Sequence, residues 1–183
     1  RQEQPSILRV YLRDKDAAYR EQKLGELLKG MLPIPQIHFI GDLGKHCFSI
    51  TEFIPGITLR DHLLSQDPSN MEELMIEAGK ILAKIQSIRF PCSGFLGKDL
   101  TIQEPITNTG YIDYARESLR HPIVIDTLEH DVASKISDIF EKYAALFPDE
   151  KQNHLAHGDF DPPNLLVDRF DGHWKITGVL DWE

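Results

Sequence analysis

The sequence has few cysteines and no long apolar run, and both absences restrict the class of protein. Only Cys47 and Cys92 occur among 183 residues, far apart and without the spacing of a zinc ribbon or a disulfide framework. No run of about 18 apolar residues is present to span a membrane, and the first residues lack the apolar core of a secretory signal. We therefore expect a cytoplasmic protein without a membrane partner.

Positive charge is scarce in the larger part of the chain. Residues 1–52 carry 8 lysines and arginines against 7 acidic residues, residues 53–183 carry 12 against 22, and the formal net charge is −9. Because basic patches hold phosphate backbones, this distribution argues against a nucleic-acid partner. It would suit a metal ion or a cationic small molecule, although acidity that serves only solubility explains it equally well.

Apolar periodicity predicts strands with one helix, then helices, then a final group of strands. The order favours an α+β protein in two lobes, with a first lobe at 1–52 and a hinge near 53–57 that opens a second lobe at 53–183. The expected strands lie at 6–13, within 36–53, and at 154–159, 164–170 and 173–183, with a tight turn at Asp171-Gly172. The expected helices lie at 14–30, after a Thr58 cap, and at 71–88, 111–120 and 126–146, and residues 90–110 read as a long loop.

Polar groups are concentrated in the segment HGDFDPPNLLV, at the mouth of a predicted strand. Asp159 and Asn164 lie five positions apart, and Asp181 lies at the end of the strand that follows. A hairpin can bring Asn164 and Asp181 to one cation, and amide and carboxylate oxygens suit Mg²⁺ that also binds nucleotide phosphates. Asp159 would then face the space before the metal, where a carboxylate can orient a hydroxyl and accept its proton.

The two motifs HGDFDPPNLLV and GVLDWE, in this order, resemble the aminoglycoside phosphotransferase family of small-molecule kinases. The resemblance implies a protein-kinase-like fold truncated at both ends, with an antiparallel sheet and one helix in the N-lobe and a mostly helical C-lobe with a catalytic hairpin. It implies transfer of the γ-phosphate of ATP or GTP to a small-molecule hydroxyl, with Mg²⁺ as cofactor. Asp159 would be catalytic, Asn164 and Asp181 would bind the metal, and His157 would be a structural residue of the loop.

The resemblance extends to the first part of the chain. The strand ILRVYLR places Arg9 where relatives hold nucleotide phosphates with Lys or Arg. Glu21 on the following helix fits the place of its acidic partner, with Glu26 as the alternative. The segment ITEFIPGITL resembles the hinge that binds adenine, and its candidate backbone contacts are Glu52, Phe53 and Ile54.

Two alternatives to a small-molecule kinase remain open. A non-catalytic, kinase-like nucleotide-binding module is opposed by the intact HGD, Asn and Asp set, and is favoured by the lack of a phosphate-covering hairpin before Arg9. A protein kinase is opposed by the HGD form of the loop. Since family members continue with further helices after the position of Asp181, we expect a truncated chain, and its acceptor and oligomeric state are not specified by the sequence.

Overall fold

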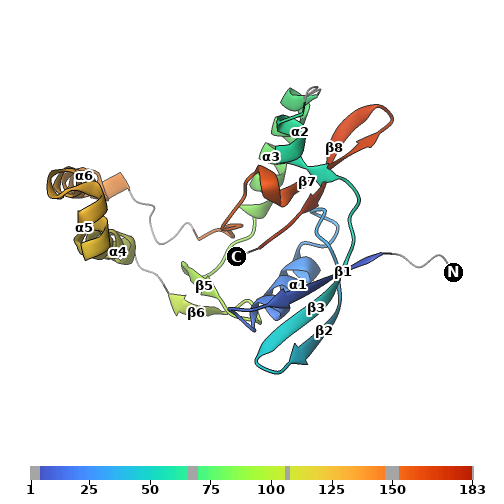
Figure 1. Cartoon of the computed structure of the whole chain (residues 1–183), viewed down its shortest axis with the longest axis horizontal. Coiled ribbons are helices and arrows are strands. Elements are labelled where there is room, and N and C mark those ends of the chain that lie inside the picture. Colours follow the sequence, from blue (N-terminus) through green and yellow to red (C-terminus); the bar gives the residue numbers. More distant parts are fainter. Residues whose placement is uncertain (1–4, 66–69, 106–107, 147–152, 183) are drawn as a thin grey trace. The chain divides into compact units, whose positions relative to one another are not determined.

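The chain forms two compact units in the computed structural model, which describes residues 5–65, 70–105, 108–146 and 153–182. The first unit comprises Arg1–Ile88, Leu96–Thr101 and His154–Glu183, and the second comprises Arg89–Phe95 and Ile102–Asn153. Figure 1 follows the chain through both units from blue to red. All the residues predicted for the nucleotide and metal sites belong to the first unit.

An antiparallel sheet opens the first unit, in the order β1–β3–β2. Its strands are β1 (Ser6–Tyr11), β2 (Ile37–Leu43) and β3 (His46–Glu52). Helix α1 (Ala17–Leu27) lies beside this sheet (Figure 1) and buries Ala18 and Leu24. Tyr11, Ala18 and Cys47 form a small core between helix and sheet. These elements all lie within residues 1–52, while the expected lobe boundary itself remains a prediction.

A second antiparallel sheet carries the polar segment, in the order β4–β7–β8. Its strands are β4 (Ile57–Thr58), β7 (Leu165–Phe170) and β8 (His173–Val179). Asp171 and Gly172 join β7 to β8 with φ values of 50° and 85°, as the predicted tight turn requires. Helices α2 (Leu59–Leu63) and α3 (Met71–Ile85) belong to the same unit, and the predicted Thr58 cap is confirmed because its side chain accepts a hydrogen bond from Asp61 N.

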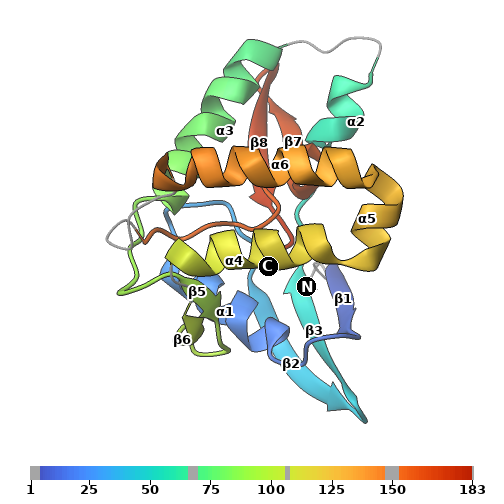
Figure 2. The same cartoon turned by 90° about the vertical axis from the view of Figure 1, so that its left-hand side faces the viewer.

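The second unit is mainly helical. Its helices are α4 (Asn108–Arg120), α5 (Pro122–Leu128) and α6 (His130–Lys142), followed by the short turn η1 (Ala144–Leu146). Figure 2 shows α4 and α6 side by side with α5 joining them, and Arg116 on α4 binds the Glu141 carboxylate on α6 at 2.6 and 2.8 Å. No helix in the described ranges of either unit is long and apolar enough to cross a membrane.

Three expectations for the middle and end of the chain are wrong. Residues 90–110 are not one loop, because β5 (Gly94–Leu96) pairs with β6 (Ile102–Pro105) and α4 begins at Asn108. The two helices expected between 111 and 146 are three, because Pro122 starts a new helix and Glu129, at φ 64°, interrupts the next. Residues 154–159 form no strand: only His154 is a bridge position, and the backbone turns at Gly158, where φ is 89°.

Candidate active site

A cavity of about 470 Å³ in the first unit gathers the residues that the sequence predicts for nucleotide and metal binding. Its volume lies in the range of small-ligand pockets. An apolar part of its wall is formed by Ile7, Ile37, Leu166 and Val179. The predicted site residues in its lining are Arg9, Glu21, Glu52, Phe53, Ile54, Asn164 and Asp181.

Charged side chains from β1, from α1 and from the segment after β8 meet in this cavity. The Arg9 Nη1 atom donates to Glu21 Oε2 at 3.1 Å, and its Nη2 atom donates to Asp181 Oδ1. Glu21 is 13% exposed, whereas Arg9 and Asp181 are 39% and 46% exposed. Glu26, the alternative partner, instead binds the exposed Lys23 at 2.7 Å. The structure therefore places Glu21, and not Glu26, against Arg9.

Burial and charge act in opposite directions in this cluster. Burial raises the pKa of the Glu21 carboxyl, and the nearby Arg9 charge and the Tyr11 hydrogen bond only partly offset that effect. Burial by itself would lower the pKa of the Arg9 guanidinium, but the carboxylates of Glu21 and Asp181 raise it overall. Arg9 therefore remains a fixed positive charge at the cavity wall.

The HGD segment forms a folded loop that brings Asp159 and Asn164 together. Two prolines open the short 3-10 turn η2 (Pro162–Asn164) and fix the backbone before Asn164. The Asn164 Nδ2 group then donates to the Asp159 backbone oxygen at 2.9 Å and to Asp159 Oδ2 at 3.0 Å. Asp159 is exposed and lies beside Asn164, which lines the cavity.

His157 is a buried residue of this loop and packs against its aromatic neighbours. Its ring is 2% exposed, lies 4.5 Å from the Trp182 ring between centroids, and meets the Phe160 ring edge-on at 5.7 Å. Its Nδ1 atom accepts a hydrogen bond from the Asp159 backbone N–H at 3.3 Å. A buried ring with these neighbours suits the structural role expected for it, which remains a prediction.

The candidate metal ligands are held side by side by the β7–β8 hairpin. The Leu180 backbone N–H donates to the Asn164 backbone oxygen at 2.8 Å, which places Asn164 next to Asp181. The Asn164 amide nitrogen is turned to Asp159, which leaves its Oδ1 atom for a cation. No group of three or more His, Cys, Asp or Glu side chains able to hold a metal occurs among the described residues. One carboxylate and one amide oxygen fit Mg²⁺, which takes few protein ligands and keeps water and phosphate oxygens.

The hinge segment closes one side of the cavity. The Glu52 backbone N–H donates to the Gln36 oxygen at 2.8 Å, and the Glu52 carboxylate accepts from the Gln36 backbone N–H at 3.1 Å. The Glu52 N–H is therefore already occupied, whereas the Glu52 backbone oxygen and the backbone groups of Phe53 and Ile54 stay candidate contacts to a base. Gly56 follows at φ 132°, where an added Cβ atom would lie 2.5 Å from the Val167 oxygen.

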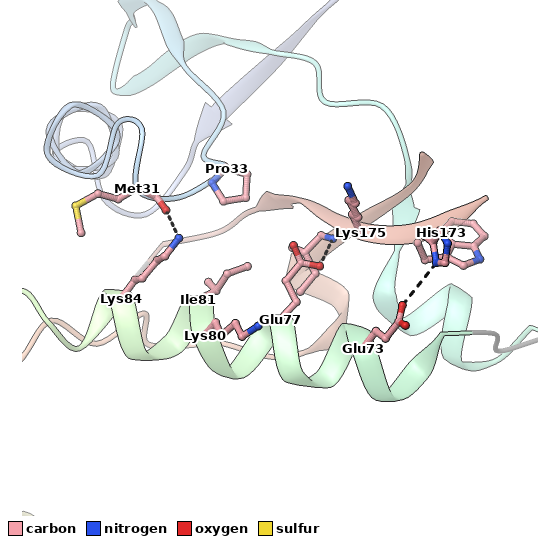
Figure 3. A pocket seen from close by; sticks show the side chains of 11 residues that line it. Met31, Pro33, Glu73, Glu77, Lys80, Ile81, Lys84, His173 and Lys175 are labelled. Atoms are coloured by element: carbon pink, nitrogen blue, oxygen red, sulfur yellow. Dashed lines mark hydrogen bonds and ion pairs between the residues drawn. The ribbon is translucent and has the colours of Figure 1, made fainter. Parts of the chain in front are cut away.

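A second pocket of about 640 Å³ lies between α3 and β8 and contains no predicted site residue (Figure 3). Several of its polar groups already have partners. Lys84 donates to the Met31 oxygen at 3.1 Å, and Glu77 accepts from the Ile176 backbone N–H at 3.1 Å. These bonds connect α3 to the α1–β2 linker and to β8, the strand that leads to Asp181.

The sequence reasoning missed a hydroxyl-bearing group beside the charged cluster. Tyr11 is 7% exposed and Ser49 is fully buried, and Thr51 lines the cavity. Strand periodicity could have indicated Tyr11, because it lies two positions after Arg9 and therefore on the same face. Ser49 and Thr51 are adjacent on one face of β3 for the same reason.

The order of sheet, helix, hinge, helices and final β7–β8 hairpin is that of a two-lobed α+β protein-kinase-like fold. A model of the phosphotransferase enzyme family (APH) matches residues 1–183, so the chain belongs to that family. A comparison with curated proteins found no match.

Solved structures of aminoglycoside phosphotransferases share this fold. APH(4)-Ia in a ternary complex with ADP and hygromycin B is 23% identical, with a TM-score of 0.70, over 98% of this chain and 59% of that chain. APH(3'')-Id from Streptomyces rimosus, in complex with ADP and streptomycin, is 15% identical, with a TM-score of 0.59, over 97% of this chain and 64% of that chain. The chain thus spans about three fifths of the length of these proteins.

Proposed function

We propose that the protein is a nucleotide-dependent phosphotransferase that moves the γ-phosphate of ATP or GTP to a hydroxyl of a small molecule. One observation carries the proposal: Arg9, Glu21, Asn164 and Asp181 line one cavity, and Asp159 is hydrogen-bonded to Asn164 beside it. Family membership supports the same reaction class.

Each residue has a role that its position supports. Arg9, paired with Glu21, holds the phosphates with a permanent charge and a fork of N–H donors. Asn164 and Asp181 hold Mg²⁺ through side-chain oxygens, and the ion, when bound, neutralises charge on the phosphates. Asp159 aligns the acceptor hydroxyl and takes its proton. The backbone oxygen of Glu52 and the backbone groups of Phe53 and Ile54 contact the base.

A cationic acceptor is the substrate class that we propose. Residues 53–183 carry 22 acidic against 12 basic residues, which favours a positively charged molecule near the catalytic loop. The similar structures of APH(4)-Ia and APH(3'')-Id are complexes of those proteins with hygromycin B and with streptomycin. The cytoplasm is the proposed compartment, because Cys47 and Cys92 are both free thiols.

The substitution Asp159→Asn in the full-length protein tests the catalytic assignment. Removing a positioned base lowers turnover by about 10²- to 10⁴-fold, whereas the affinity for ADP should change less than about twofold, since Asp159 is not in the cavity lining. Nucleotide consumption with a panel of amine-bearing hydroxyl compounds measures turnover, and calorimetry measures ADP binding.

Asp161→Asn is the matched control, because Asp161 is an exposed carboxylate of the same loop. Its turnover should match that of the wild type. A wild-type rate for Asp159→Asn would remove Asp159 from the proposed mechanism, and no ADP binding by the wild-type protein would refute the proposed function itself.

A further inference from the structure

Tyr11 connects the phosphate-binding pair to the interior of the first sheet. Its hydroxyl donates to Glu21 Oε2 at 3.0 Å, the same oxygen that accepts from Arg9 at 3.1 Å. The Arg9 guanidinium carbon also lies 5.0 Å from the centroid of the Tyr11 ring, within the range of a cation–π contact. Tyr11 therefore contacts both members of the pair, one by its hydroxyl and the other by its ring.

The direction of the hydrogen bonds follows from the acceptor at their end. An ionised carboxylate only accepts, so the single Tyr11 proton is committed to Glu21. The Ser49 hydroxyl, 3.3 Å away, must then donate to the Tyr11 oxygen. The Thr51 hydroxyl, 3.1 Å from that of Ser49, in turn donates to Ser49. The four residues form one directed chain from Thr51 to Glu21, and Thr51 and Glu21 both line the cavity.

The surroundings keep this chain in one arrangement. Ser49 is fully buried and Tyr11 is 7% exposed, so water does not compete for their hydroxyls. Burial is the largest cause of a raised Tyr11 pKa, and the Glu21 charge adds to it. Together they raise the pKa of Tyr11 to about 12. The phenol therefore keeps its proton at neutral pH and remains a donor.

We propose that Tyr11 is a positioning residue that fixes Glu21 and Arg9 for the nucleotide phosphates, with Ser49 orienting its hydroxyl. The inference rests on the proposed nucleotide site and adds a residue to it. Without the phenol, Glu21 would lose one of its two donors and Arg9 would be held by a less well oriented partner. The defect should affect recognition of phosphates and leave recognition of the base unchanged.

The substitution Tyr11→Phe in the full-length protein tests this inference, because it removes only the hydroxyl. Calorimetry with Mg²⁺ and ADP should show a dissociation constant raised about tenfold, as expected for a lost bond to a charged group. Adenosine, measured by its displacement of ADP, should bind within about twofold of wild type. Ser49→Ala should weaken ADP binding in the same direction but by less.

Tyr19→Phe is the matched control, because Tyr19 is 38% exposed on α1 and should bind both ligands as the wild type does. Equal ADP affinity in Tyr11→Phe and wild type would overturn the inference. An equal loss for ADP and adenosine would also overturn it, because that pattern indicates a merely structural defect. If the wild type binds neither ADP nor adenosine, the proposed function itself is refuted. This outcome can be distinguished from the two outcomes that overturn only the role of Tyr11.

Discussion

At the scale of single residues, Glu21 is a mostly buried carboxylate that two donors share. Its side chain is 13% exposed and accepts hydrogen bonds from both Arg9 and Tyr11. Two donors on one oxygen normally stabilise a carboxylate. Burial has the larger effect here and raises the Glu21 pKa despite them. The cluster is thus held together at a cost in stability, as is common where charges are arranged to bind a ligand.

This balance predicts a pH dependence of stability. Because the Glu21 pKa is higher in the folded than in the unfolded protein, the folded state binds more protons at pH values between the two. The Glu21 contribution to the free energy of unfolding should therefore fall as pH rises. The fall begins at about 4.3, the ordinary pKa of glutamate, and is complete above the higher pKa that Glu21 has in the folded protein. Glu21→Gln should remove this fall, so its stability relative to wild type should increase with pH.

Urea unfolding over a pH series measures this effect in the absence of nucleotide. Glu26→Gln provides the control, because Glu26 is an exposed carboxylate on the same helix that pairs with Lys23. Its pH profile should follow that of the wild type. Parallel profiles for Glu21→Gln and wild type would show that burial does not raise the Glu21 pKa.

At the scale of elements, the site depends on turns that bring separate strands to one cavity. The hairpin turn at Asp171 and Gly172 sets the register in which Leu165 pairs with Val179, and this register places Asn164 beside Asp181. The hinge makes a second such turn at Gly56, whose φ of 132° suits only glycine. Both turns lie outside the polar motif, yet both determine where its side chains lie.

Two glycine substitutions test the importance of the hinge turn. Gly56→Ala should lower the free energy of unfolding by about 1–3 kcal/mol, because a Cβ atom would add backbone strain and meet the Val167 oxygen at 2.5 Å. Gly79→Ala on α3, where no described atom beyond the chain neighbours and the helix's own backbone lies within 4 Å of the added Cβ, should raise it by about 0.5–1 kcal/mol. Chemical denaturation measures both, and equal effects of the two substitutions would contradict the assignment of strain to Gly56.

At the scale of the whole molecule, the two compact units have different parts in the proposed function. Every residue that lines the 470 Å³ cavity belongs to the first unit. The second unit contains α4, α5 and α6, and none of the described residues in that lining comes from these helices. Binding of nucleotide should therefore be a property of the first unit, whereas the acceptor class remains part of the proposed function.

Hydrogen–deuterium exchange can test this separation directly. Addition of ADP and Mg²⁺ to the full-length protein should slow exchange in the peptides that cover 5–12, 51–56 and 164–166, because ligand contacts reduce local opening there. Peptides that cover α5 and α6 should exchange at the same rate with and without ADP. Comparable protection of α5 and α6 would show that nucleotide binding involves the second unit.

The sequence alone predicted the parts of the protein that depend on short-range patterns. Strand alternation and the Asp171-Gly172 turn identified the β7–β8 hairpin, and the spacing of the HGD, Asn and Asp motifs identified the family. Strands β2 and β3 were also predictable, because the sequence shows two β-rich segments joined by a Gly-containing turn. The middle of the chain was not, because the polar segment at 90–110 gives no periodic signal for a short hairpin such as β5–β6.

Only the tertiary structure decided which side chains meet. The sequence favours Glu21 as the partner of Arg9 but leaves Glu26 open, and the position of α1 beside the sheet places Glu21 against Arg9. The link from Tyr11 through Ser49 joins β1 to β3, residues 38 positions apart. The local sequence pattern indicates whether a segment forms a helix or a strand and which of its residues share a face. Contacts between distant residues depend on how the elements pack against one another, and the local pattern does not specify that packing.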